Sequence, residues 1–174
     1  SIKVNIDGFS EAMSESEMIP PLVKIDSVIY FKNIEKEILL DVYFNDPSIK
    51  NYYAIKFIRS YNDTLVSETD TEYRIFNPTI VFDDKLFNSQ SYSYERKLSL
   101  YAGRYNNKSL YYNHLDVILF SLSKTGYQFF SSMDESDLTN GDMFTSTTEI
   151  QSNIINGFGV FAPYSTDTLK INLE

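Results

Sequence analysis

The chain contains no cysteine, no tryptophan and a single histidine among its 174 residues. Without cysteine it can form neither disulfides nor thiolate zinc sites, and it has no cysteine nucleophile. A lone histidine, His114, makes a poor zinc site and is more typical of a structural or solvated side chain. The sequence also lacks the G-x-S-x-G turn of many serine hydrolases. These absences exclude several common catalytic classes.

Long apolar runs and positive charge are also scarce. Runs such as residues 117–120 fall far short of the ~20 apolar residues that a membrane-spanning helix needs. Lys and Arg number 15 against 24 Asp and Glu, which gives a formal net charge of −9. An acidic surface repels phosphate backbones and anionic lipid, so we expect no nucleic-acid partner. No signal peptide is recognisable, and we expect a mature protein or one whose leader was removed.

Aromatic residues are abundant, with 14 Tyr and 13 Phe, and 43% of the residues are hydrophobic. These proportions are sufficient for a packed core, and Tyr, Phe, Val and Ile favour half-buried strands. Alternating apolar residues predict strands at 38–44, 52–61, 91–101, 114–123 and 168–173, with shorter ones at 28–31, 73–76, 79–82 and 157–162.

The strand spacing predicts the fold class. A three-to-four period replaces the two-residue period over residues 124–137, which predicts one helix. Short strands with turns between them, among them 163–167, indicate an all-β antiparallel sandwich of about seven strands, of immunoglobulin or fibronectin-III-like type. The helix is inserted before the last strands. A parallel α/β fold is excluded because the helices that it needs between strands are missing.

Two parts of the chain differ in composition. Residues 1–24 combine a short alternating strand, an acidic run and the extended segment Ile19-Pro20-Pro21. They form either a flexible lead-in or the remnant of a preceding domain. Residues 25–174 form the predicted sandwich domain.

Carboxylate pairs could support glycoside hydrolysis, which requires two carboxyl groups at a set separation. The candidates are Asp83 with Asp84, and Asp134, Glu135 and Asp137. All lie in predicted turns or at a helix end, where Asp is common for local reasons. Alignment with a calcium loop fails, because it places Leu138 at a ligand position, and no glycine-rich phosphate loop is present. We therefore predict no catalytic residue, no metal and no cofactor.

Clustered tyrosines are the strongest indication of binding in the sequence. A tyrosine that faces outward from a sheet suits stacking on a sugar or contact with a peptide, because its ring is amphipathic. The alternative is that these residues simply favour strands. The candidate binding residues are Tyr52, Tyr92, Tyr101, Tyr105 and Tyr111.

The C-terminal block resembles a known family. Residues 150–161, IQSNIINGFGVF, are similar to the SNI-x-x-G-(L/F)-G-(I/V)-F signature of the DUF4249 family of Bacteroidetes lipoproteins. Asp46-Pro47 followed by Asn51-Tyr52-Tyr53 resembles a further strand of that family. The resemblance extends from about residue 19 to the end of the chain.

The resemblance implies an exported protein at the outer membrane, the cell surface or in the periplasm. It implies a non-enzymatic accessory or binding domain that associates with a TonB-dependent nutrient transporter and binds a glycan or peptide ligand. Membrane attachment is expected only through an N-terminal lipid anchor, which this chain lacks. The alternatives are an adhesion or structural module of a larger surface protein, and a glycan hydrolase.

Overall fold

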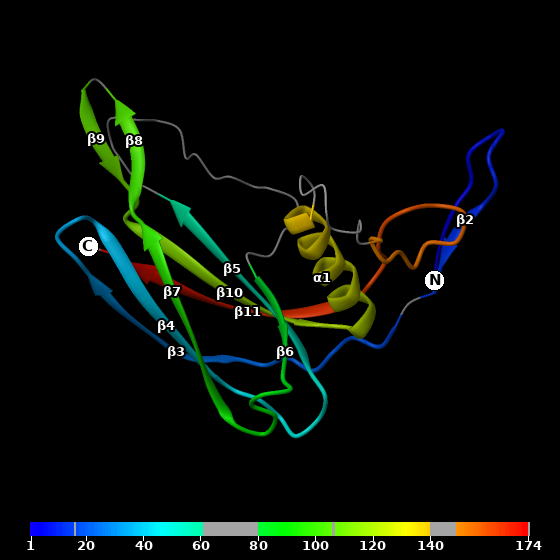
Figure 1. The fold of residues 1–174 in the computed structure, drawn as a ribbon, viewed down its shortest axis with the longest axis horizontal. Coiled ribbons are helices and arrows are strands. Elements are labelled where there is room, and N and C mark those ends of the chain that lie inside the picture. Colours follow the sequence, from blue (N-terminus) through cyan, green and yellow to red (C-terminus); the bar gives the residue numbers. More distant parts are fainter. Residues whose placement is uncertain (16, 61–79, 106, 140–148, 174) are drawn as a thin grey trace.

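The structure is a computed structural model that describes residues 1–15, 17–60, 80–105, 107–139 and 149–173 (Figure 1). Within these residues, two antiparallel sheets face each other. One sheet has the order β3-β4-β7 and comprises β3 (Ile25–Lys32), β4 (Glu37–Asn45) and β7 (Ser91–Ser99). The other has the order β11-β10-β5-β6 and comprises β5 (Tyr52–Ser60), β6 (Ile80–Asp83), β10 (His114–Leu122) and β11 (Tyr164–Asn172).

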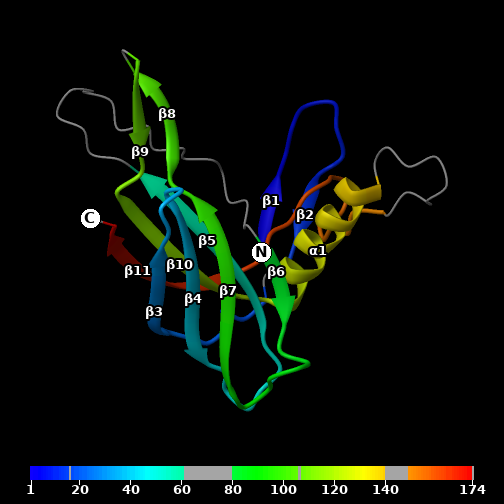
Figure 2. The same ribbon diagram turned by 60° about the vertical axis from the view of Figure 1, so that its left-hand side comes forward.

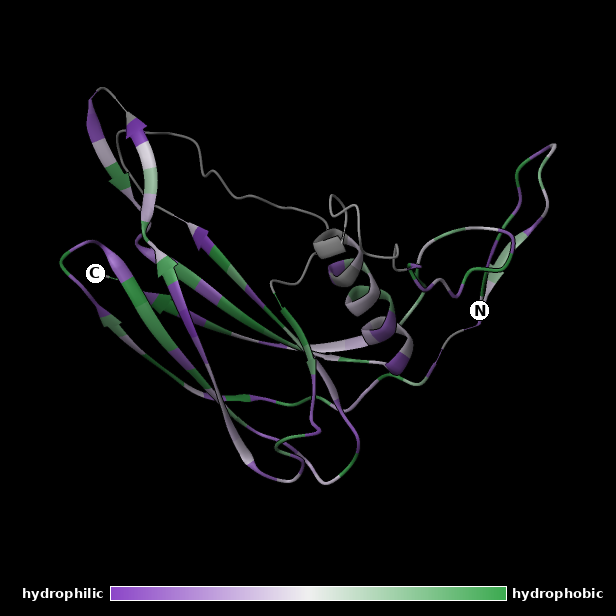
Figure 3. Cartoon of the chain, viewed as in Figure 1, coloured by the Kyte–Doolittle hydropathy of each residue, from purple (hydrophilic) through white to green (hydrophobic). Residues whose placement is uncertain are grey.

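The alternating apolar residues of the strands form the core between the two sheets. Figure 3 shows these apolar stretches along the strands of both sheets. Leu40 and Phe44 of β4 and Val117 and Leu119 of β10 are completely buried, whereas the residues between those of β4 are more exposed. A two-residue period places one row of side chains on each face of a strand. The predicted all-β antiparallel sandwich is confirmed, and its assignment to the immunoglobulin or fibronectin-III type stays a prediction.

The predicted helix is also confirmed, as α1 (Lys124–Thr139). The hydroxyl of Ser123 accepts a hydrogen bond from the Gly126 backbone N–H at 3.3 Å, which is the geometry of an N-cap. Tyr127 and Phe130 pack against the outer face of the larger sheet, where Phe120 is buried. Strand β10 is therefore apolar on both faces because the core covers one and α1 packs over the other. The described residues include no helix with the length and apolar character needed to cross a bilayer.

Two hairpins lie outside the sandwich. One pairs β1 (Ile2–Val4) with β2 (Ala12–Ser14), and the other pairs β8 (Tyr101–Tyr105) with β9 (Lys108–Tyr111). The second projects away from the two sheets (Figure 2). The sequence predicted one strand through residue 101, but β7 ends at Ser99.

The break between β7 and β8 has a local cause. The Leu100 side chain is 1% exposed, and its backbone N–H donates to the Lys36 carbonyl at 2.9 Å. The chain therefore turns inward at Leu100 before the hairpin begins.

The prediction for residues 157–162 is wrong, because this segment is a loop. The Asn153 side chain accepts from the Phe161 N–H and donates to the Phe161 carbonyl, each at 2.9 Å, so a side chain takes the place of a partner strand. The predicted turn at 163–167 is also wrong, because Leu122 pairs with Tyr164 and the β10–β11 ladder continues from there. The predicted strand at 79–82 is found as β6, and the one at 73–76 lies outside the described residues.

Residues 1–24 contact the sandwich domain at several points. Met13 and Ile155 exchange backbone hydrogen bonds of 3.1 and 2.8 Å. The Thr125 hydroxyl donates to the Glu17 carboxylate at 2.6 Å, at the start of α1. These contacts tie the segment to α1 and to the loop that precedes β11, and the division of the chain at residue 24 stays a prediction.

Candidate functional site

Tyr52 is half-buried. It faces away from the core, as predicted, but its ring stacks on Tyr127 of α1 with centroids 4.7 Å apart. The Lys50 ammonium lies 5.3 Å from the Tyr52 ring centroid. The helix therefore takes up the surface that the sequence assigned to a ligand.

Tyr92 is placed differently from the sequence prediction. It lies on the inner face of β7, with its ring centroid 3.9 Å from that of Phe87, and burial raises the pKa of its hydroxyl. The prediction that Tyr92 faces outward is therefore wrong. Alternation along β7 was recognised, but Tyr92 and Tyr94 share one face, and that face packs against the core.

Tyr101 and Tyr111 meet on the surface of the β8–β9 hairpin. Their side chains are 49% and 42% exposed, and their rings pack edge to face with centroids 6.1 Å apart. The Lys36 ammonium lies 6.0 Å from the Tyr111 centroid. Tyr105 belongs to β8 by its backbone, and its side chain lies outside the described structure. Of the five predicted tyrosines, the structure brings these two together on an open surface.

The end of the hairpin that joins the sandwich is fixed to it. The Tyr112 N–H donates to the Leu100 carbonyl at 2.7 Å, and the Asn113 N–H donates to the Ser60 carbonyl at 3.1 Å. The guanidinium of Arg59 lies 5.0 Å from the Tyr112 ring centroid and donates to the Ser99 carbonyl. Tyr101 and Tyr111 are adjacent to these anchors, so their rings are presented from a supported position.

The electrostatics of the hairpin differ from those of the whole chain. Residues 100–113 include Arg104 and Lys108 and no acidic residue, in a chain of net charge −9. The surface combines exposed ring faces, phenolic hydroxyls and cationic side chains. Such a set can stack on a sugar ring and donate hydrogen bonds to its oxygens. Lys36, which the sequence analysis did not identify, joins it through a turn more than sixty positions earlier in the chain.

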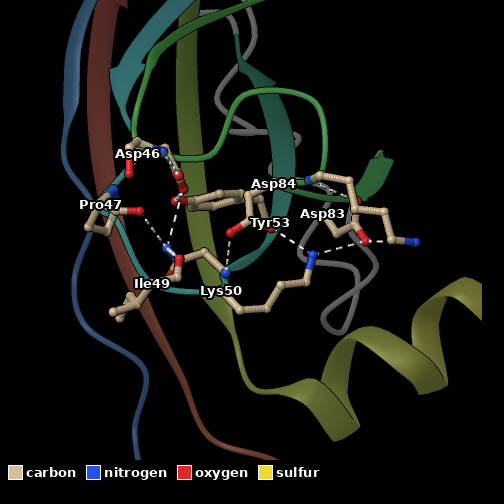
Figure 4. Close-up of polar contacts among 10 residues, drawn as sticks. Asp46, Pro47, Ile49, Lys50, Tyr53, Asp83 and Asp84 are labelled. Carbon is tan, nitrogen blue, oxygen red and sulfur yellow. Dashed lines mark hydrogen bonds and ion pairs between the residues drawn. The ribbon is translucent and has the colours of Figure 1, made fainter.

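The β4–β5 and β6–β7 connections lie at the end of the sandwich away from the β8–β9 hairpin (Figure 1). A cluster of polar residues joins them (Figure 4). The buried Asp84 carboxylate accepts from the Lys50 ammonium and from the Asn51 N–H, each at 2.6 Å. Asp46 accepts from the Tyr53 hydroxyl and from the Ser89 N–H. Each carboxylate oxygen of Asp46 and Asp84 has a protein donor.

The ionisation of this cluster follows from its contacts. Burial, and then the hydrogen bond to Asp46, raise the pKa of the Tyr53 hydroxyl. The hydrogen bond to Asp84 raises the pKa of Lys50. Although burial acts in the opposite direction, hydrogen bonds from Lys85 and Lys50 lower the pKa of Asp83. Lysines therefore pair with Asp83 and Asp84, whereas Asp46 accepts hydrogen bonds from neutral donors. The role of the cluster is to join the β4–β5 turn to the segment between β6 and β7.

The other candidates of the sequence analysis are dispersed. His114 is half-buried, with its Nδ1 2.7 Å from the Asn113 side-chain oxygen. Asp134 is exposed on α1, and the side chains of Glu135 and Asp137 lie outside the described structure. Among the described residues, no three acidic or histidine side chains gather in a position to hold a metal ion.

The C-terminal sequence signature has a structural explanation. The Ser152 hydroxyl accepts from the backbone N–H groups of Ile154 and Gly159, each at 3.2 Å. A Cβ at position 157 would approach the Ile154 side chain to 2.8 Å, and Gly159 has a φ of +133°. These residues form a tight loop that only glycine accommodates at the two positions.

Comparison with known proteins gives one match. A family model described as a domain of unknown function, DUF4249, matches residues 1–170. The match includes residues 1–18, which the sequence resemblance did not cover. No curated protein and no solved structure matches the chain significantly.

Proposed function

The chain belongs to the DUF4249 family, and from this premise we propose that it is a non-enzymatic binding domain of an exported surface lipoprotein. The domain binds a glycan through the β8–β9 hairpin and assists its import by a TonB-dependent outer-membrane transporter. The exposed edge-to-face pair of Tyr101 and Tyr111 is the observation that carries this proposal.

Three properties of the pair favour a glycan. The rings are exposed on a projecting hairpin, so an extended ligand reaches them from solvent. Their hydroxyls supply hydrogen bonds beside an apolar face, which matches the mixed character of a sugar ring. Lys36 adds a donor next to Tyr111. Asp46 and Asp84 have the most buried carboxylates described, and protein donors occupy their oxygens. This supports a binding role rather than catalysis.

Glycan binding is tested first with the intact protein. A glycan array identifies ligands, and calorimetry compares the wild type with the Tyr101→Ala/Tyr111→Ala double variant. We expect the variant to lose about tenfold or more in affinity, because stacking on an aromatic ring contributes on the order of 1 kcal/mol for each ring. The control is Phe9→Ala, since Phe9 is 78% exposed and lies between β1 and β2, outside the β8–β9 hairpin. Equal losses in the two proteins would contradict the assignment of the site.

The partner is tested separately. The full-length lipoprotein is purified from outer membranes under mild detergent, and co-purifying proteins are identified by mass spectrometry. A stoichiometric TonB-dependent transporter is the expected partner. Recovery of the lipoprotein without any transporter would contradict this part of the proposal. The result of the glycan experiment would not be affected.

A further inference from the structure

An apolar pocket of about 310 Å³ lies between α1 and the segment that enters β11. The residues that line it come from two elements, and on each element they follow a regular spacing. Gly126, Phe129 and Phe130 have the three-to-four spacing of one helix face, and Val160, Ala162 and Tyr164 have the two-residue spacing of one side of an extended segment. The pocket lies well apart from the β8–β9 hairpin, so it is independent of the proposed glycan site.

The family signature fixes one wall of the pocket. The side chain of Asn153 holds both backbone groups of Phe161, and this keeps the flanking residues Val160 and Ala162 turned toward α1. A Cβ at position 126 would lie 3.4 Å from the Ala162 Cβ, so the two walls approach closely there. Phe129 and Phe130 line the pocket farther along the helix. The close approach of α1 to the segment at Ala162 therefore sets the position of the two walls, and side chains from both elements line the space between them.

The chemistry of the lining defines the ligand. All the lining side chains are uncharged, and aromatic rings from Phe129, Phe130 and Tyr164 contribute to the walls. A charged group would lose its hydration here without gaining a partner. The volume lies at the lower end of the ~300–1,000 Å³ that is typical of small-molecule sites, and it is about twice the ~150 Å³ of an apolar cavity that takes up benzene.

We propose that this pocket is a binding site for an uncharged aromatic small molecule of about two fused rings. Such a molecule packs against the three rings of the lining and displaces water from an apolar wall. Its polar edge points to the open side of the pocket, where the Tyr164 side chain is 50% exposed.

Indole is the probe for this site, because it is neutral and has two fused rings. Titration of the intact, ¹⁵N-labelled protein is expected to give saturable shifts at residues 122–130 and 160–164, with a Kd of about 1 mM or tighter. Absence of saturable shifts at these residues would overturn the proposal.

Two variants distinguish the pocket from other apolar surfaces. Ala162→Leu places a larger side chain in the pocket and is expected to weaken indole binding by about tenfold or more. Ala102→Leu makes the same change in β8, where Ala102 is half-buried, and is expected to leave the affinity within about twofold.

Circular dichroism and thermal unfolding confirm that each variant is folded. If Ala162→Leu does not fold, Phe129→Ala removes one ring of the wall and is expected to weaken binding as well. Unchanged affinity in a folded pocket variant would overturn the proposal. The outcome is independent of the glycan experiment, because the pocket variants Ala162→Leu and Phe129→Ala lie outside the β8–β9 hairpin.

Discussion

The two ends of the sandwich use tyrosine in opposite ways. At one end, Tyr53 and Tyr92 lie among other rings, and the Tyr53 hydroxyl is bound to a buried carboxylate. At the other end, Tyr101 and Tyr111 lie on a projecting hairpin with nearly half of each side chain exposed. An aromatic-rich composition therefore serves the core at one end and a candidate binding surface at the other. Mutations at the first end should therefore lower stability, whereas mutations at the hairpin should mainly lower ligand affinity.

The largest expected effect on stability is at the end that contains Tyr53 and Tyr92, here called the closed end. Phe44 is completely buried and contacts the rings of Tyr53, Phe87 and Tyr92. We expect Phe44→Ala to reduce the free energy of unfolding by about 3–5 kcal/mol, because it leaves a cavity among these rings. Urea unfolding followed by circular dichroism measures the change. Phe158→Ala, at a side chain that is 70% exposed, is the control and should cost less than about 0.5 kcal/mol.

A smaller effect is expected from the polar cluster. Asp46→Ala removes the acceptor of the Tyr53 hydroxyl and of the Ser89 N–H. We expect a loss of about 1–3 kcal/mol in the free energy of unfolding, because buried donors are left without partners. Tyr53→Phe in the same background removes one of those donors. A double-mutant cycle with additive losses would contradict the coupling inferred between Asp46 and Tyr53.

The closed end should also make stability depend on alkaline pH. The pKa of Tyr53 is raised in the folded protein, so above pH ~10 the unfolded chain loses a proton that the folded protein retains. Stability contributed by the neutral hydroxyl is fully present below pH ~10 and falls as the pH rises, by at most about 1.4 kcal/mol per pH unit. Unfolding in urea at pH 8, 10 and 11 measures this slope. Tyr53→Phe should reduce the slope, and an unchanged slope would assign it to other groups.

The smallest effect on stability is expected at the hairpin. Tyr101→Ala/Tyr111→Ala removes an exposed ring pair whose contact is worth about 1 kcal/mol. We expect a loss of at most that size in the free energy of unfolding, together with the loss of glycan affinity described above. A loss comparable to that of Phe44→Ala would mean that the two ends do not differ as inferred.

The sequence was a good guide to the strands of the sandwich and a partial guide to the site. The alternation around Leu40, Ile55 and Val117 predicted the buried rows because a strand places every second residue on one face. Tyrosine clustering identified Tyr101 and Tyr111, but it placed Tyr52 and Tyr92 with them. Lys36 was missed because its contact with Tyr111 depends on the pairing of Lys36 with Leu100, residues far apart in sequence.

The sequence by itself determined the all-β class, the helix that follows β10 and the family, because periodicity and the signature at residues 150–161 are local properties of the chain. The tertiary structure decided which aromatic faces stay open, because that depends on what packs over a strand from elsewhere. Tyr52 is covered by α1, Tyr92 by the core, and Tyr111 by neither. The apolar pocket likewise arises only where the helix and the segment held by Asn153 come together, since neither element forms a concave surface alone.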